Sequence, residues 1–424
     1  MPENTIWKTV SALSWIFPEI MGQTKKSCGI PEQILGTAVK TLQKWNDSAL
    51  TLDECINDIR SEKAAVSILF LYFRHKDTID TLIRNAASKG NVKSPLFEIA
   101  ACTLSQALFQ TGIAAQSAVN VAVDYTKKIN FRLGGFMNAL LRNALRAADG
   151  KTFPPDFPEK LRKRWNKLFG KENAAEAIEA CGINPPLCFR IRGIDDPPAG
   201  STPIPLNRNF RFYFHEIPAE VLESQLFKSG KCYIQDPATG LSVSLCGELP
   251  EQAKILDCCA APGGKTVMLY DKYPDAEIIA ADKSERRLQQ MQENFIRLHV
   301  KAKTVCADAL APEFGNESFD AVFIDAPCTN TGVMRRRPDA AWRFSLNRLE
   351  DTVKLQRKIL NAMAPIVRRG GILLYSTCSV EAEEDTLQVE QFLQDHPEFE
   401  LEESQLLLPG FMHDGAFSAR LRKR

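Results

Sequence analysis

Apolar residues recur at helical spacing through the first 150 residues, which contain many alanines and few β-branched runs. The segment SPLFEIAACTLSQALFQTG, residues 94–112, shows the pattern clearly. Ser94 can cap a helix, Pro95 suits its first position and Gly112 can end it. A second helix is predicted between the glycine pair at 134–135 and Gly150, in GGFMNALLRNALRAADG. The pattern therefore predicts an all-α domain over residues 1–150.

A proline-rich segment, TFPPDFP at residues 152–158, interrupts this regularity and predicts a linker. The basic segment EKLRKRWNKLFGK follows at residues 159–171. Its helical spacing predicts that Trp165 and Phe169 pack inside the protein rather than stack on bases. Alternating apolar residues in PPLCFRIRGIDDPP, residues 185–198, predict a short strand. Together these features predict a small α+β domain over residues 151–230.

From residue 231 onward, strand-like runs alternate with helix-forming sequence. The strand candidates are AKILDCC (253–259), AEIIAAD (276–282), KAKTVCAD (301–308), FDAVFID (319–325) and GGILLYSTCS (370–379). Such alternation is typical of a doubly wound, Rossmann-like α/β domain with a parallel sheet. Ligands of these folds bind at the carboxyl ends of the strands. We therefore predict an α/β domain of this kind over residues 231–424.

Composition narrows the class of protein only slightly. The net charge of +1 provides no overall field, so any nucleic-acid binding must depend on local basic clusters. Twelve cysteines without a C-x-x-C pair indicate free thiols in a reducing compartment, and Cys55 and Cys102 are expected to be buried. Residues 1–21 lack a basic start, and Pro18 and Glu19 interrupt their apolar run. We therefore expect no signal peptide or membrane span, and a cytoplasmic protein.

The segment ILDCCAAPGGKT, residues 255–266, resembles a phosphate-binding loop that has lost its first glycine. Such a loop needs glycine where Cys259 stands, five residues before Gly264. Pro262 and Gly263 still predict a tight turn at the start of a helix. There the backbone can approach a ligand and exposed N–H groups can bind polar acceptors. The turn is therefore expected to hold a ligand other than a triphosphate, and the sequence predicts no metal site.

Four successive predicted strands end in an aspartate, namely Asp257, Asp282, Asp308 and Asp325. A single acid at a strand end is more often a helix cap than a ligand, but four in register favour a nucleoside-like ligand. Asp282 lies about 20 to 25 residues beyond the turn, where such folds place the acid that binds ribose hydroxyls. S-adenosylmethionine has a ribose and an adenine but no phosphate. It is therefore the preferred candidate.

Two cysteines follow the last two predicted parallel strands, Cys328 in FIDAPCTNTG and Cys378 in LLYSTCSV. If these strands are neighbours, both thiols face the crevice that holds the donor. A thiolate that adds to carbon 6 of a pyrimidine makes carbon 5 nucleophilic enough to accept a methyl group. A second group must then remove the carbon 5 proton. Two cysteines can divide this work, but their spacing does not assign the roles, and a chance pair of buried cysteines is the alternative.

The sequence resembles the Sun (RsmB-like) family of RNA cytosine-5 methyltransferases. Similar motifs in that family occur in the order DCCAAPGGKT, DAPCTNTGV followed by RRRPD, and YSTCS. SAVNVAVDYTKK and GGFMNALLRNALR look like the end of the family's NusB-like RNA-binding domain. PPLCFRIR resembles the start of its middle domain, YIQDPAT the approach to its catalytic core and DGAFSARLRK its closing strand. The resemblance covers nearly the whole chain and implies that the helical domain is NusB-like and the α/β domain a methyltransferase.

The resemblance also implies roles for individual residues. Cys378 would be the nucleophile, and Cys328 would assist release of the product. Asp325 would also lie near the cytosine. Asn330 and Arg192 depart from the family pattern, and neither is expected to touch the chemistry. The implied donor pocket consists of Cys259, Ala260, Ala261, Pro262, Gly263, Gly264, Lys265, Asp282, Asp308 and Asp325.

Candidate RNA contacts lie just beyond Cys328, where Arg335, Arg336 and Arg337 could meet phosphates beside the target base. A solvated run of charge is the alternative reading. The basic C-terminal residues 420–424 do not distinguish RNA binding from solubility. A target cytosine must be flipped or single-stranded, because carbon 6 is inaccessible inside a duplex.

The predicted function is methylation of carbon 5 of a cytosine in small-subunit ribosomal RNA before the subunit is complete. We expect a monomer that binds RNA and no membrane. One alternative keeps the chemistry and changes the substrate to transfer RNA. A non-catalytic RNA-binding assembly factor is another, but it would not need both cysteines and the four strand-end acids. An ATPase is disfavoured by Cys259.

Overall fold

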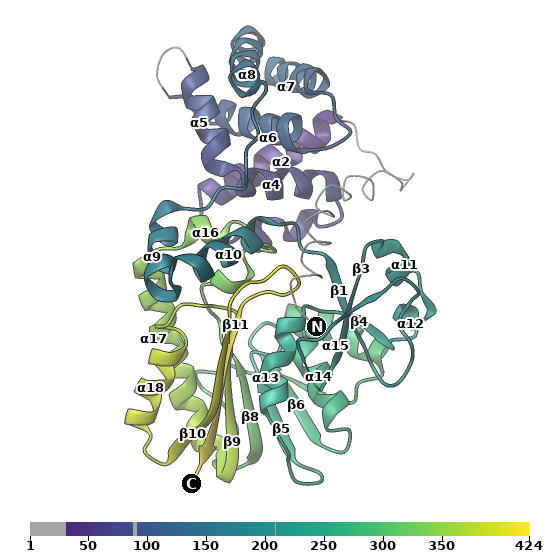
Figure 1. Cartoon of the computed structure of the whole chain (residues 1–424), viewed down its shortest axis with the longest axis vertical. Helices are drawn as coiled ribbons and strands as arrows, with labels where there is room; N and C mark the ends of the chain where they lie inside the picture. Colours follow the sequence, from purple (N-terminus) through teal and green to yellow (C-terminus); the bar gives the residue numbers. More distant parts are fainter. Residues whose placement is uncertain (1–30, 88–90, 208) are drawn as a thin grey trace. The chain divides into compact units, whose positions relative to one another are not determined.

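The computed structural model describes residues 31–87, 91–207 and 209–424 (Figure 1). The described residues form two compact units, one up to residue 158 together with 337–342, and the other between 159 and 336 together with 343–424. The boundary at residue 158 coincides with the end of the predicted linker, whereas the three-domain division at residues 150 and 230 stays a prediction. Residues 1–21 lie outside the described residues. Within the described ranges, no helix is long and apolar enough to cross a membrane.

The N-terminal unit is a helical bundle around one hydrophobic core, as predicted. Ser94 does not cap α6, because its hydroxyl accepts a hydrogen bond from Gln43 (2.9 Å) and Pro95 precedes the first turn. Cys55 and Cys102 are buried in the core as expected, and no disulfide joins two cysteines of the described ranges. The helices are α2 (Pro31–Asn46), α3 (Leu52–Cys55), η2 (Asn57–Ile59), α4 (Lys63–Arg74), α5 (Lys76–Ala86), α6 (Leu96–Phe109), α7 (Ala115–Ile129), η3 (Phe131–Leu133) and α8 (Gly134–Ala148).

A short segment from far along the chain, residues 337–342, also belongs to the N-terminal unit. Asp339 accepts hydrogen bonds from the Leu52 backbone (2.8 Å) and from the Trp45 indole (3.3 Å). The Trp342 indole donates to the Phe73 carbonyl (2.7 Å) and packs against the helical core. A domain division that follows chain order therefore misses this segment.

The second unit contains a seven-stranded sheet in the order β10-β11-β9-β8-β5-β6-β7 (Figure 1). Five strands are parallel, and all five were predicted, whereas β10 and β11 are antiparallel. The strands are β5 (Lys254–Cys258), β6 (Glu277–Asp282), β7 (Lys303–Cys306), β8 (Phe319–Asp325), β9 (Val367–Thr377), β10 (Phe399–Leu407) and β11 (Ala416–Lys423).

The central strands are apolar on both faces because helices cover both sides of the sheet. Ile255 and Phe323 join the core under α13 (Gly240–Leu245) and α14 (Gly264–Lys272). Their neighbours Leu256 and Val322 point the opposite way, to the core under α17 (Leu346–Met363) and α18 (Thr386–Asp395). This period of two explains why the strands appear as continuous apolar runs in the sequence. α15 (Glu285–Leu298) packs beside α14 over β6.

An antiparallel sheet, β2-β3-β1-β4, precedes the parallel one and contains the predicted strand at β1. Phe212 of this sheet shares a core with Ile255 and Met268, so the two sheets are continuous in packing. The remaining elements are α9 (Glu159–Phe169), α10 (Lys171–Gly182), β1 (Leu187–Ile191), β2 (Thr202–Ile204), β3 (Arg211–His215), α11 (Pro218–Leu222), α12 (Gln225–Lys228), β4 (Cys232–Ile234), η4 (Pro237–Thr239), η5 (Thr331–Val333), α16 (Ala340–Arg343) and η6 (Ala364–Ile366).

Side chains from both basic segments of this unit make contacts within the fold. Trp165 of α9 is fully buried, and its indole donates to Glu381 (2.9 Å), so it packs as predicted. At the C-terminus, Arg420 pairs with Glu402 (2.6 Å), and Arg424 pairs with Glu400 (2.6 Å) across the β10–β11 ladder. These C-terminal arginines therefore serve cross-strand pairing.

Candidate active site

The two cysteines lie together at the carboxyl edge of the parallel sheet. β8 and β9 are adjacent parallel strands, with Asp325 opposite Ser376 in their register. Each cysteine follows directly in the loop after its strand. The sulfur atoms of Cys328 and Cys378 are 3.0 Å apart, and both residues are half-buried. The prediction that neighbouring strand ends bring the two thiols together is confirmed.

The contact between the sulfur atoms differentiates the two thiols. The hydrogen bond with Cys378, followed by burial, raises the pKa of the Cys328 thiol well above its ordinary value. Cys328 therefore keeps its proton at neutral pH. Two thiolates at this distance would repel each other, whereas one S–H group can stabilise a thiolate beside it. A proton on Cys328 can therefore stabilise a thiolate that forms on Cys378.

Asn330 contacts both cysteines, so the expectation that it lies away from the chemistry is wrong. The Cys378 thiol donates to Asn330 Oδ1 (3.1 Å), and Asn330 Nδ2 donates to the Cys328 carbonyl (3.1 Å). Asn330 has a φ of 62°, in the left-handed region that Asn enters more readily than most residues. The Asn in this loop was therefore a feature from which the sequence could have indicated a special backbone position beside Cys328. Arg192, in contrast, pairs with Asp271 of α14 (2.7 Å).

A buried carboxylate that the sequence interpretation missed, Glu384, holds the loop around Cys328. It accepts hydrogen bonds from the Thr329 backbone N–H (2.9 Å), the Thr329 hydroxyl and Gln356 Nε2 (3.0 Å). The same Gln356 amide donates to the carbonyl of Pro327 (3.0 Å). Both residues that flank Cys328 are thereby fixed. Burial raises the pKa of Glu384, although its hydroxyl and amide donors oppose that effect.

The glycine turn after β5 is held by the end of β6. The Ala261 N–H donates to Asp282 Oδ2 (3.2 Å), and Asp282 Oδ1 accepts the N–H of Ser284 (2.9 Å). Gly263 has a φ of 97°, and a Cβ there would lie 2.6 Å from the Met291 side chain of α15. Glycine is therefore required for helix packing as well as for the turn.

Lys265 joins the turn to the cysteine side of the site. Its ammonium group lies 2.5 Å from Asp325 Oδ1 and 3.1 Å from the Ser376 hydroxyl. The structure thus gathers residues 259–265, Asp282, Asp325 and both cysteines at one edge of the sheet. Asp308 is exposed beyond β7, and its carboxylate accepts the Leu310 N–H (2.9 Å). None of its described contacts reaches the turn.

Asp257, at the end of β5, is a fully buried acid below the turn. Its Oδ2 accepts a hydrogen bond from the Thr266 hydroxyl (2.5 Å), and its Oδ1 has no hydrogen-bond partner among the described residues. Burial raises the pKa of Asp257 to about 7, and the nearby charge of Asp325 adds to the effect. A buried oxygen without a partner is costly, so this atom fits a cationic or hydrogen-bonding group of a ligand.

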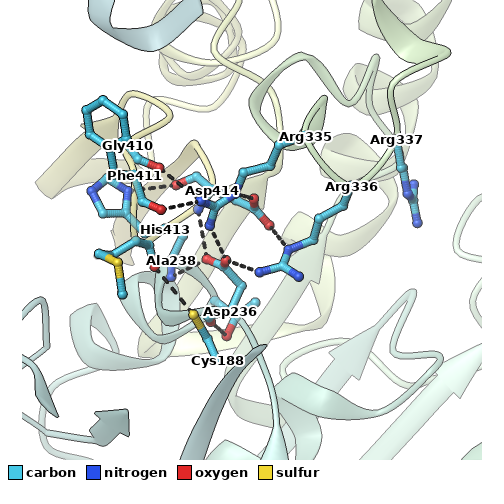
Figure 2. A network of polar contacts seen from close by, with 12 residues as sticks. Cys188, Asp236, Ala238, Arg335, Arg336, Arg337, Gly410, Phe411, His413 and Asp414 are labelled. Carbon is cyan, nitrogen blue, oxygen red and sulfur yellow. Dashed lines mark hydrogen bonds and ion pairs between the residues drawn. The ribbon is translucent and has the colours of Figure 1, made fainter. Parts of the chain in front are cut away.

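Arg335 does not reach solvent, so the prediction that it meets RNA phosphates is wrong. Its side chain is 1% exposed and pairs with Asp414 (2.5 Å) and Asp236 (2.9 Å). It also donates to the carbonyls of Gly410 (3.0 Å) and Phe411 (2.9 Å) (Figure 2). The guanidinium is therefore committed to internal acceptors.

Arg336 completes an arginine–aspartate quartet of Arg335, Arg336, Asp236 and Asp414 (Figure 2). Its guanidinium lies 2.8 Å from each carboxylate, although its side chain is 34% exposed. Arg337 belongs to the N-terminal unit, where it pairs with Asp53 (3.0 Å). The quartet joins the loop after Cys328 to the start of η4 and to the loop before β11. Arg335 and Arg336 therefore anchor the loop that follows Cys328.

The two carboxylates of the quartet differ in acidity. Burial raises the pKa of Asp236, but the guanidinium groups of Arg336 and Arg335 more than offset this and hold it below its ordinary value. Burial and the neighbouring Asp236 raise the pKa of Asp414. Two cations and two anions make the quartet neutral overall, which is the condition for burying such charges.

Comparisons with known proteins match both the helical and the α/β part of the chain. The family model described as "16S rRNA methyltransferase RsmB/F" matches residues 245–416, and the NusB family model matches residues 33–146. Ribosomal RNA small subunit methyltransferase B of Vibrio cholerae is 33% identical over 321 residues, 70% of this chain and 73% of that protein. This chain belongs to the RsmB/F family. The protein of the same name from Pasteurella multocida is 33% identical over 337 residues, 71% of this chain and 72% of its own.

Solved structures support the fold of this RsmB/F family member. The crystal structure of PH0851 superposes with a TM-score of 0.73 at 22% identity and covers 94% of this chain and 100% of its own. NSun6 from Pyrococcus horikoshii with SFG has a TM-score of 0.53 at 24% identity, over 63% of this chain and 98% of its own. The predicted multidomain fold is confirmed.

Family membership settles the general class of activity. RsmB/F proteins form a family of S-adenosylmethionine-dependent RNA cytosine-5 methyltransferases with a NusB domain. The predicted resemblance is therefore confirmed. Membership also counts against the ATPase and the non-catalytic assembly factor.

Proposed function

We propose that this RsmB/F protein methylates carbon 5 of a cytosine in small-subunit ribosomal RNA through a covalent adduct with Cys378. The observation that carries the proposal is the contact of 3.0 Å between the sulfur atoms of Cys378 and Cys328 at the end of adjacent parallel strands. The choice of RNA is supported by the relatives from Vibrio cholerae and Pasteurella multocida, which are both named for the small ribosomal subunit.

The turn after β5 has the donor set that S-adenosylmethionine requires. Asp282 can accept hydrogen bonds from ribose hydroxyls beside the backbone of residues 259–265. The unpartnered Oδ1 of buried Asp257 suits an amino group. When bound, S-adenosylmethionine supplies an electrophilic methyl group. The residues present therefore fit this donor.

Cys378 acts first, as a thiolate that adds to carbon 6 of the cytosine. The new C–S bond takes the sulfur's electron pair, and the carbon 5–carbon 6 double bond shifts its electrons so that carbon 5 becomes nucleophilic. The S–H of Cys328, 3.0 Å away, stabilises the attacking thiolate. Asn330, which contacts the Cys378 sulfur, helps to hold it in place.

Cys328 acts after carbon 5 has been methylated. The largest cause of its raised pKa is its hydrogen bond to Cys378, and that cause disappears once the Cys378 sulfur is bonded to carbon. Without that cause Cys328 can release its own proton to water, which is the one proton that the overall reaction sets free, and its thiolate can take the carbon 5 proton. The electrons of the broken C–H bond restore the double bond, and Cys378 leaves as a thiolate. Cys328 is thus a hydrogen-bond donor before methyl transfer and a base after it, whereas Cys378 is the nucleophile and the leaving group.

Asp325, at the end of β8, is the acid that we assign to the cytosine. Its carboxylate, with 37% of the side chain exposed, is held by Lys265 at 2.5 Å, which leaves lone pairs for an amino or imino hydrogen of the base. This contact would distinguish cytosine from uracil, because the amino group at carbon 4 of cytosine donates a hydrogen bond. Lys265 and Ser376 keep the carboxylate oriented.

A substrate competition tests the RNA assignment. Purified protein is incubated with S-adenosylmethionine and either naked small-subunit ribosomal RNA, the assembled subunit or transfer RNA, and 5-methylcytosine is then mapped by bisulfite sequencing. We expect one cytosine of the naked ribosomal RNA to be methylated, and little reaction with the assembled subunit. Methylation of transfer RNA alone would refute the ribosomal assignment and leave the chemistry intact.

A further inference from the structure

The N-terminal unit has a concentrated patch of exposed apolar side chains. Ile129 is 50% exposed, Phe131 78% and Phe136 41%, all within eight consecutive positions. Among the described residues of this unit, Leu50 is the other large apolar side chain that is exposed. Isolated exposed apolar residues are common on proteins, whereas a cluster with two phenyl rings marks a binding surface.

The backbone at this corner is well supported. Phe131 lies in η3, between α7 and α8, and Asn130 caps η3 by accepting the N–H of Arg132 (3.0 Å). A Cβ on Gly134 would lie 2.6 Å from Cγ of Lys127, so the lysine stem packs directly on the glycine. The corner therefore presents Phe131 from a compact connection between two packed helices.

The charge around this corner has one sign. Five cationic residues and no Asp or Glu occur between positions 127 and 148. Acids of other segments neutralise two of the five, because Lys127 pairs with Asp124 (3.2 Å) and Lys128 pairs with Glu32. The other three cations are exposed, and their guanidinium groups have no described ion pair. They are Arg132, Arg142 and Arg146.

Of these three cations, only Arg132 is next to a phenyl ring in the chain, because it directly follows Phe131 in η3. Phe136 is exposed at the start of α8, whereas the buried positions of α8 face the core. At 3.6 residues per turn Arg142 lies about 120° round α8 from Phe136, so the Phe131 corner contains one cation without a described ion pair. A flat apolar ring next to unpaired guanidinium groups is the combination that binds single-stranded nucleic acid.

We propose that this surface, which we call the Phe131 surface (Ile129, Phe131, Arg132 and Phe136), binds unpaired nucleotides of the substrate RNA. A base stacks on Phe131, and Arg132 contacts the adjoining phosphate. The inference rests on the proposed function, since it concerns the RNA that the active site methylates. RNA is favoured over a protein partner because the exposed aromatic rings stand with Arg132, an exposed cation that lacks a described ion-pair partner.

Variants of Phe131 in the full-length protein test the stacking. With naked small-subunit ribosomal RNA, Phe131→Ala should raise KM about tenfold and leave kcat unchanged, because the ring binds RNA and takes no part in the reaction. Phe131→Tyr should restore the KM, since it keeps an aromatic face, whereas Phe131→Leu should not. Leu50→Ala, at another exposed apolar position of the unit, should have no effect.

Salt dependence tests the phosphate contact. Arg132→Gln should reduce the slope of log Kd against log salt by about 0.7, the value for one phosphate contact on a single strand. Arg84→Gln, a change at an exposed arginine of α5, should leave the slope unchanged. An unchanged slope for Arg132→Gln would contradict the phosphate contact.

The results separate this inference from the proposed function. If the wild type methylates ribosomal RNA but Phe131→Ala retains its KM, the surface does not bind RNA and a protein partner becomes the better explanation. If Phe131→Ala lowers the melting temperature by several degrees, the ring packs against the chain itself and the inference fails. If the wild type methylates no ribosomal RNA, the proposed function fails, and RNA binding by Phe131→Ala and Phe131→Tyr in a filter assay still decides the inference.

Discussion

Removing one arginine of the arginine–aspartate quartet should cost far more at position 335 than at position 336. Arg335→Met and Arg336→Met delete the same guanidinium and leave the same two carboxylates with one cation. The wild-type side chains differ in burial, because that of Arg335 is 1% exposed and that of Arg336 is 34% exposed. The pair of variants therefore isolates the effect of solvent access.

The expected magnitudes follow from the contacts. Arg335→Met removes two ion pairs and the hydrogen bonds to the carbonyls of Gly410 and Phe411. Breaking a buried pair by removing one partner costs about 3–5 kcal/mol. Water can reach the carboxylates where Arg336 stood, so Arg336→Met should cost about 1 kcal/mol, the upper end for solvent-accessible pairs.

The loss of folding stability caused by Arg335→Met, here called the deficit, should also depend on pH. With one cation gone, an excess negative charge is buried, and the pKa of the carboxyl pair rises in the folded variant. A carboxyl group with a raised folded pKa destabilises the fold above that pKa and ceases to do so as the pH falls through it. Burial already raises the pKa of Asp414 in the wild type. The deficit should therefore be smaller at about pH 5 than at about pH 8.

Hydrogen exchange of the β9 and β11 amides measures the free energy of unfolding that each variant loses. It reports the opening of the second unit separately from the helical unit. Equal deficits for the two variants would refute the argument from burial. A deficit for Arg335→Met that grows on acidification would refute the charge argument, since protonation would then fail to relieve it.

Three further predictions concern the active site. Cys378→Ala should lose methyl transfer and RNA capture, whereas Cys328→Ala should retain methylated RNA as a shifted band on a denaturing gel; the reverse pattern would make Cys328 the nucleophile. Asp282→Ala should weaken S-adenosylmethionine binding by about 1–3 kcal/mol in calorimetry, and an unchanged Kd would remove Asp282 from the site. Asn330→Gly keeps the left-handed backbone but removes the amide, so iodoacetamide should alkylate Cys378 faster; an unchanged rate would show that the contact is incidental.

The sequence by itself determined the elements and the meeting of the two cysteines. Period-two burial and helical spacing depend on which residues are apolar locally, so the five parallel strands and the helices α6 and α8 were predictable. The rule that parallel strands carry their ligands at one edge then placed Cys328 and Cys378 together. These inferences need only local pattern and a general rule of topology. The separation of the sulfurs is set by the contacts of Asn330 and Glu384.

Only the tertiary structure decided what the arginine run does. Asp236 and Asp414 are 178 positions apart, yet the Asp414 N–H donates to Asp236 Oδ1 (2.9 Å), and both acids surround Arg335. Nothing local to Arg335 distinguishes it from Arg337, which lies in the other unit. A charge is buried or exposed according to which distant groups the fold brings to it. The free-energy cost of burying a charged group is offset only when such partners neutralise its charge in the folded chain.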